Sequence, residues 1–122
     1  MYKDLVIISV IMLILDSFYL KAISPLFNEM FIEIQGEPIK INYLSAALCY
    51  CLLVFGLYYF IVKDDKSLLD AFLLGIVIYG IYDTTNMATI AKWRWKAVFV
   101  DTIWGGILMT ITYYLTKKLT TN

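Results

Sequence analysis

Three aspartates lie inside stretches of the sequence that are otherwise apolar. Asp16 lies in "LDSFYL", Asp83 in "YDTTNMAT" and Asp101 in "VDTIWG". A carboxylate near the middle of a bilayer costs roughly 2.5 to 3.5 kcal/mol on insertion scales, and no lysine or arginine lies within these apolar stretches to neutralise it. We therefore expect the three side chains to face the protein interior, where protonation, a bound cation or a water-filled vestibule offsets that cost.

The elements that carry these aspartates are long apolar runs. The chain has 122 residues, is 61% hydrophobic and contains no histidine. Four runs bounded by charged residues are each long enough to cross a hydrocarbon core of roughly 30 Å as a helix. The first run keeps Asp16 in its core and lacks a small-residue cleavage site, so we expect a retained helix and not a signal peptide. The sequence therefore predicts an all-α integral membrane four-helix bundle, a single transmembrane domain with spans at about 5–20, 43–62, 71–91 and 97–116.

The segment between the first two spans has its own helical pattern. Its apolar residues follow the i, i+3, i+4 spacing of an amphipathic helix over about residues 23–35: Ile23, Leu26, Phe27, Met30, Phe31 and Ile34. Pro25 fits the first turn of such a helix, and Gly36 with Pro38 ends it. We expect an interfacial helix that lies flat on the membrane surface, or alternatively one that packs on a partner subunit.

The directions of the spans predict that the three aspartates meet. Asp16 lies just before the end of the first span, Asp83 lies in the last half of the third, and Asp101 lies near the start of the fourth. Because the first and third spans run in the same direction and the fourth runs back, all three aspartates fall in one leaflet. Residues three or four positions from an aspartate lie on the same face of its helix, and a threonine hydroxyl on that face can add a further polar group. The predicted binding or translocation site comprises Asp83, Asn86, Asp101, Asp16, Trp104, Tyr79, Tyr82, Tyr19 and Thr85.

The remaining features concern the scaffold and its orientation. Ser67 and Asp70 predict a capping box at the start of the third helix, and Trp93 and Trp95 suit the headgroup zone. The second span carries no internal charge and is expected to act as scaffold. Basic residues are balanced five to five between the two sides of the membrane, so the positive-inside rule does not fix the orientation. The acidic first loop favours cytoplasmic termini.

The motifs quoted above resemble those of a widespread, mostly bacterial family of small four-helix predicted membrane proteins, a domain of unknown function. The similarity covers almost the whole chain and rests on the Leu-Asp, Tyr-Asp-x-Thr-Asn and Asp-x-x-Trp-Gly elements. Tyr19 stands where the family usually has a tryptophan. The family's motif positions correspond here to Asp16, Tyr82, Asp83, Thr85, Asn86, Asp101, Trp104 and Gly105. The resemblance supports a site at these residues without implying an activity.

Four functions are compatible with this pattern. The first is transport or conduction of protons, small cations or a small cationic solute by a homo-oligomer, most simply a homodimer, with Asp83 binding the ion and Asn86 orienting it. The second is a module that binds a lipid headgroup or an amine through carboxylates and aromatic rings. The third is an enzyme acting on lipids, although the sequence lacks a histidine base and a nucleophile elbow. The fourth is a membrane scaffold in which the carboxylates join helices.

The sequence also excludes several partners. The absence of histidine argues against haem, and the absence of a lysine within a span argues against a retinal Schiff base. Cys49 and Cys51 are spaced two apart and do not form a metal-binding pattern. We therefore expect no metal, no cofactor, no catalytic residues and no nucleic-acid partner. The expected partners are membrane lipids, a second copy of the chain and a small cation or cationic ligand.

Overall fold

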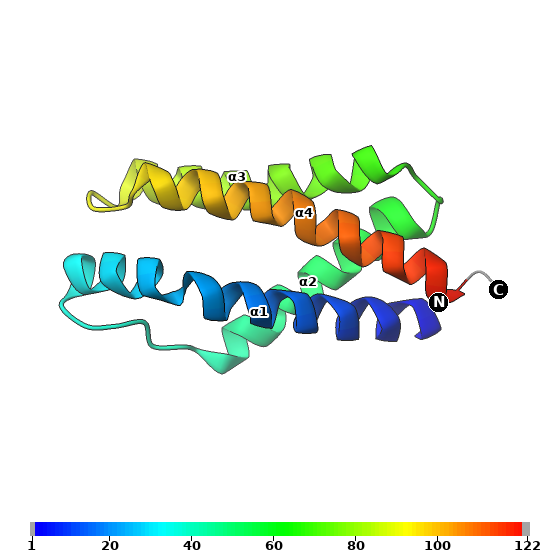
Figure 1. Cartoon of the computed structure of the whole chain (residues 1–122), viewed down its shortest axis with the longest axis horizontal. Helices are drawn as coiled ribbons and strands as arrows, with labels where there is room; N and C mark the ends of the chain where they lie inside the picture. The colour runs from blue at the N-terminus through cyan, green and yellow to red at the C-terminus, as the bar shows by residue number, and fades with distance from the viewer. Residues whose placement is uncertain (1, 121–122) are drawn as a thin grey trace.

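The computed structural model describes residues 2–120, which form a bundle of long helices (Figure 1). All four long helices are apolar enough to cross a membrane, which confirms the predicted four-helix membrane bundle: the protein is a multi-pass integral membrane protein. Since α1 begins and α4 ends at the same end of the bundle, successive helices run in opposite directions (Figure 1). The elements are α1 Tyr2–Gln35, α2 Tyr43–Leu57 with its π-helical continuation η1 Tyr58–Val62, α3 Leu68–Thr89 and α4 Trp95–Thr120.

The separate interfacial helix expected over residues 23–35 is corrected by the structure. These residues are helical, but they continue α1 through Pro25 without a break. A proline inside a helix leaves the carbonyl four residues earlier without its N–H donor, here the carbonyl of Lys21, and the Ser24 hydroxyl donates to that oxygen at 3.1 Å. The helix ends where the sequence predicts, because Gly36 adopts a left-handed conformation with φ 78°.

The apolar face of this α1 extension, residues 23–35, packs on the turn between α3 and α4 of the same chain. Met30 and Trp93 are buried together, and the rings of Phe27 and Phe31 meet the Trp93 indole edge-on at centroid distances of 6.1 and 5.7 Å. The apolar face of the extension is therefore covered by the α3–α4 turn of the same chain. Trp93, expected in the headgroup zone, is only 3% exposed, whereas Trp95 is 58% exposed.

Charged residues hold the same junction on its outer side. Arg94 forms ion pairs with Glu29, at 3.3 Å, and with Glu33. Lys92 donates a hydrogen bond of 2.9 Å to the backbone carbonyl of Glu33. A helix of 34 residues is about 51 Å long, well beyond a hydrocarbon core of roughly 30 Å. The α1 extension therefore lies beyond the part of α1 that is needed to cross the hydrocarbon core. The α3–α4 turn, which it contacts, lies at the same level.

Helices α3 and α4 approach each other closely along a line of glycines. A methyl group added at Gly75 would collide with the backbone of Gly105 and Gly106, and one added at Gly105 would collide with the ring of Tyr79. Small residues permit this kind of close helix packing in membranes, where van der Waals contact holds helices together. Gly105, the last residue of the Asp-x-x-Trp-Gly element, is thus required for space.

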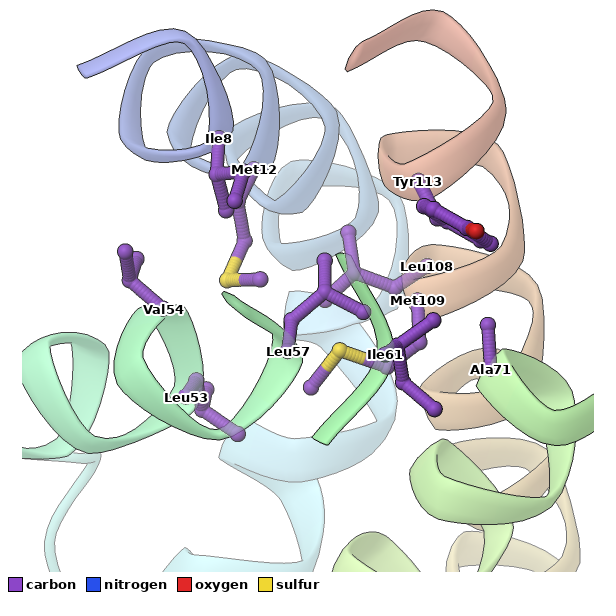
Figure 2. Close-up of a cluster of buried hydrophobic side chains, with 10 residues drawn as sticks. All are labelled: Ile8, Met12, Leu53, Val54, Leu57, Ile61, Ala71, Leu108, Met109 and Tyr113. Atoms are coloured by element: carbon purple, nitrogen blue, oxygen red, sulfur yellow. The ribbon is translucent and has the colours of Figure 1, made fainter. Parts of the chain in front are cut away.

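All the long helices contribute to one apolar core (Figure 2). Ile8 and Met12 come from α1, Leu57 from α2 and Met109 from α4, and each of these side chains is fully buried. The predicted capping box is confirmed, because Ser67 and Asp70 each accept the other's backbone N–H. Helix α2 is inclined to the other three (Figure 1) and leaves a space beside α3.

Candidate functional site

Asp16 joins three helices by hydrogen bonds. Its side chain is 6% exposed. It accepts from the Tyr50 hydroxyl of α2 and from the Trp104 indole N–H of α4, the latter at 2.9 Å. These two bonds connect α1 to α2 and to α4 near the end of the apolar part of α1.

Asp101 forms the reciprocal tie between α4 and α1. It is 8% exposed and accepts from the Tyr19 hydroxyl at 2.9 Å. The ring of Tyr19 stacks on that of Trp104 with a centroid distance of 4.6 Å and an interplanar angle of 2°. Each helix therefore supplies one carboxylate and one aromatic donor to the other. Asp16 and Asp101 are brought to one level of the bundle by these two crossed bonds.

Asp83 is the exception in the cluster. It is completely buried, and neither of its carboxyl oxygens has a hydrogen-bond partner within residues 2–120. The Asp101 carboxyl group and the Trp93 indole are close enough to interact with it, yet the indole nitrogen of Trp93 also lacks a partner within that range. Leaving a buried polar group unsatisfied costs about 1 to 3 kcal/mol, and more for a charged group. Within the described residues, Asp83 is thus the buried carboxyl group of the cluster that the fold leaves without a hydrogen bond.

The other predicted residues lie on the outer side of the cluster. Tyr82 is 56% exposed, and its ring meets that of Trp93 edge-on at 6.3 Å. The Asn86 side chain is half-buried and makes no hydrogen bond to Asp83; its backbone carbonyl accepts the N–H of Ile90 where α3 ends. Thr85 is exposed. The structure thus brings together the three aspartates with Tyr19, Tyr79 and Trp104, and leaves Asn86 and Thr85 apart from the carboxyl groups.

Two residues that contact the carboxylates were not identified from the sequence. Tyr50 lies on the span interpreted as scaffold, and Trp93 was assigned to the headgroup zone. The signal for Tyr50 is the physical demand of its hydroxyl, which needs a partner when it lies inside a membrane span. For Trp93, the signal is the apolar face of residues 23–35, which needs an apolar side chain to pack against.

A cleft of about 680 Å³ opens between α2 and α3 and reaches the cluster from the side. Asp101 lies in its lining, whereas Asp16 and Asp83 do not. Because Leu52 and Tyr82 at its edge are exposed, the cleft faces the surroundings of the bundle between two membrane-spanning helices. The lining consists of Ser45, Leu48, Cys49, Leu52 and Leu53 of α2, Ile78, Tyr79 and Tyr82 of α3, and Asp101 of α4.

The donor set of the site is made of carboxyl, phenol and indole groups. Within residues 2–120, no group of three or more His, Cys, Asp and Glu side chains lies close enough to hold a metal ion. Carboxylates beside aromatic faces are suited to protons, ammonium groups and quaternary ammonium groups.

Comparisons with known proteins place the chain in one family. No curated protein and no solved structure matches it. A family model described as "Predicted membrane protein (DUF2177)" matches residues 1–117, which include all three aspartates and the aromatic residues that surround them. The chain therefore belongs to this family of membrane proteins, DUF2177.

Proposed function

We propose that this protein binds a membrane amphiphile with a cationic headgroup in the cleft between α2 and α3. The observation that carries the proposal is an apolar cleft of about 680 Å³ with the Asp101 carboxyl group in its lining. A pocket of this size, mostly apolar with a few polar groups that fix orientation, is typical of small-molecule sites. Because the cleft opens sideways between two membrane-spanning helices, an amphiphile enters it from the bilayer.

The chemistry of Asp101 and its neighbours defines the headgroup. Tyr19 donates to Oδ1 of Asp101, and the same carboxyl group lies in the lining of the cleft. Tyr79 and Tyr82 line the same cleft, and their ring faces attract cations. An ammonium or quaternary ammonium group is thus matched by one carboxylate and two rings, while the alkyl chain contacts the leucine side chains of α2.

The decisive experiment compares Asp101→Asn with the unmodified protein in lipid nanodiscs. A fluorescent alkyltrimethylammonium probe is titrated into both, with an alkyl maltoside of equal chain length as competitor. We expect Asp101→Asn to weaken probe binding about tenfold, since it removes a charge-assisted contact, and the uncharged maltoside to compete poorly. Asp64→Asn, which removes an exposed carboxylate from the α2–α3 turn, is the matched control. Equal probe affinity for Asp101→Asn and the unmodified protein would refute the proposal.

Two cysteines provide a second readout of occupancy. Cys49 lines the cleft, whereas Cys51 does not, and both are exposed. In Cys51→Ser protein, the probe should slow modification of Cys49 by a small thiol reagent. In Cys49→Ser protein, modification of Cys51 should be unchanged. Equal protection of both thiols would place the probe elsewhere on α2.

A second candidate function, transport of protons or small cations, is favoured by Asp83. Its two buried oxygens have no hydrogen-bond partner within residues 2–120, and membrane carboxylates without internal counter-charges commonly mark ion pathways. Four helices make a thin pore wall, so this candidate includes a homodimer. Proton and cation flux into liposomes should fall in Asp83→Asn, and undiminished flux would eliminate this candidate.

A further inference from the structure

A second cleft of about 390 Å³ lies at the opposite end of the seam between α2 and α3. It is formed where η1 meets the first turns of α3. Its apolar part includes the buried Ile61 (Figure 2) and the more exposed Phe60 and Leu73. Lys66 and Asp70 are its charged lining residues. An apolar cleft with one cation and one anion is therefore present in the leaflet that does not hold the three aspartates.

Backbone contacts fix the positions of both charged residues. The Lys66 N–H donates to the carbonyl of Ile61 at 3.0 Å, and the Lys66 carbonyl accepts from the Tyr113 hydroxyl. The Asp70 N–H donates to the Ser67 hydroxyl at 3.1 Å, and Oδ2 of Asp70 accepts the Ser67 N–H at 3.4 Å. This arrangement leaves Oδ1 of Asp70 and the ammonium group of Lys66 for a ligand.

Neighbouring lysines at this end are already engaged. Lys63 lies over the ring of Tyr59 at 4.2 Å, Lys118 lies over that of Tyr114 at 5.4 Å, and Lys117 pairs with Asp65 at 2.9 Å. The Lys66 ammonium group, by contrast, makes neither a hydrogen bond nor an ion pair within the described part of the chain, residues 2–120. Among these four lysines, the one that lines the cleft, Lys66, is thus the one without such a contact.

The backbone at the cleft is also unusual. Residues Tyr58–Val62 form a π-helix, and the Lys63 N–H donates to the carbonyl of Tyr58, five residues earlier, at 2.8 Å. π-helical turns are rare and occur frequently at functional sites. Here the wider turn supplies two consecutive residues, Phe60 and Ile61, to the lining of the cleft.

We propose that this second cleft binds a glycerophospholipid whose headgroup carries both a phosphate and a primary ammonium group. Lys66 donates to the phosphate, and Oδ1 of Asp70 accepts from the ammonium group, so both charges of the headgroup are matched. The apolar lining contacts the beginning of an acyl chain. A lipid is the occupant that this geometry favours, because the charged pair lies at the end of the spans and the apolar part continues between them.

Native mass spectrometry of the detergent-solubilised protein tests this site with three lipids of equal chain length: phosphatidylethanolamine, phosphatidylcholine and phosphatidylglycerol. We expect phosphatidylethanolamine to bind most tightly. Lys66→Gln should weaken binding of phosphatidylethanolamine and phosphatidylglycerol about tenfold, because both lose the phosphate contact. Asp70→Asn keeps an acceptor oxygen for the Ser67 N–H, and it should weaken phosphatidylethanolamine but not phosphatidylglycerol, which carries no ammonium group. Lys63→Gln, which removes a lysine outside the cleft, should change neither.

Three results would overturn the inference: tighter binding of phosphatidylglycerol than of phosphatidylethanolamine, unchanged binding in Lys66→Gln, or equal effects of Lys66→Gln and Lys63→Gln. Val77→Trp provides an independent variant, since Val77 lines the apolar part and a bulky side chain there should block the lipid. Phosphatidylethanolamine binding by Val77→Trp as tight as that by the unmodified protein would also contradict the site. The loss of phosphatidylethanolamine binding caused by Lys66→Gln should be the same in the Asp101→Asn background as in the unmodified protein, so this site and the cleft at Asp101 can fail separately.

Discussion

The two seams that α3 makes with its neighbours differ in packing. Along the seam with α4, Gly75 faces the backbone of Gly105 and Gly106 so closely that a single methyl group does not fit. Along the seam with α2, two clefts of about 680 and 390 Å³ separate the helices. Within α2 itself, a methyl group added at Gly56 would meet nothing within 4 Å. The α3–α4 pair is thus tightly packed, while α2 stands apart from α3.

The tight seam positions residues of the acidic cluster, and the open seam leaves space beside them. The tight seam fixes Asp83 and Asp101 relative to each other, because their helices cannot shift without a backbone collision. The open seam provides space for a ligand next to Asp101. The hydrogen bond from Tyr50 to Asp16 connects α2 to the acidic cluster. A polar contact thus helps to position α2, whereas close packing at glycines positions α4 against α3.

The largest expected effect comes from filling the tight seam. Gly75→Ala places a methyl group against the backbone carbonyl of Gly105, which cannot move aside as a side chain can, so we expect the free energy of unfolding to fall by about 1 to 3 kcal/mol. Gly56→Ala is the matched control on α2, and it should be stabilising by about 0.5 to 1 kcal/mol because alanine favours the helix. Unfolding in mixed micelles measures both. A neutral Gly75→Ala variant would show that the two seams do not differ.

A smaller effect is expected from removing the hydroxyl that holds α2. Tyr50→Phe deletes the bond to Asp16, which keeps the Trp104 N–H, and should cost about 1 kcal/mol. It should also speed modification of Cys49 in the cleft. Tyr19→Phe removes a comparable bond to Asp101, but the ring stays stacked on Trp104, so Cys49 reactivity should not change. If both variants alter Cys49 equally, Tyr50 has no special part in positioning α2.

The smallest effect concerns the ion pair between Asp65, in the turn before α3, and Lys117 near the end of α4. Lys117, which donates a hydrogen bond to Asp65, holds the pKa of that carboxyl group below its usual value. The pair therefore stabilises the fold above the ordinary aspartate pKa of about 4, and this contribution is lost as the pH falls through the lower folded value. Asp65 has φ 50°, a conformation that asparagine tolerates. Asp65→Asn should lower the melting temperature slightly at pH 7, and the difference should shrink on acidification; a constant difference would contradict the ion pair.

Much of the fold could be predicted from the distribution of charges and apolar residues. Lengths of apolar runs determine membrane spans because the bilayer thickness is fixed, and the Ser67 and Asp70 capping box is a local signal. The continuity of α1 could not be predicted in this way. It depends on the Ser24 hydroxyl replacing the missing N–H of Pro25 and on a tertiary contact with Trp93.

The candidate site shows the same division. Helix directions were sufficient to place Asp16, Asp83 and Asp101 in one buried region. The hydrogen bond from Tyr50 could not be anticipated, because it depends on the inclination of α2 and not on any pattern within that helix. The same holds for the cleft, whose volume depends on how far α2 stands from α3.

The α1 extension has a consequence for how any ligand reaches the acidic cluster. It buries Trp93 beneath Phe27 and Phe31, and its glutamates are held by Arg94, so the aqueous end of the bundle next to Asp83 is sealed by protein. A ligand that enters through the α2–α3 seam instead arrives by two-dimensional diffusion. Occupancy then depends on the mole fraction of the ligand in the lipid phase, and compounds that partition strongly into bilayers are favoured over equally charged compounds that stay in water.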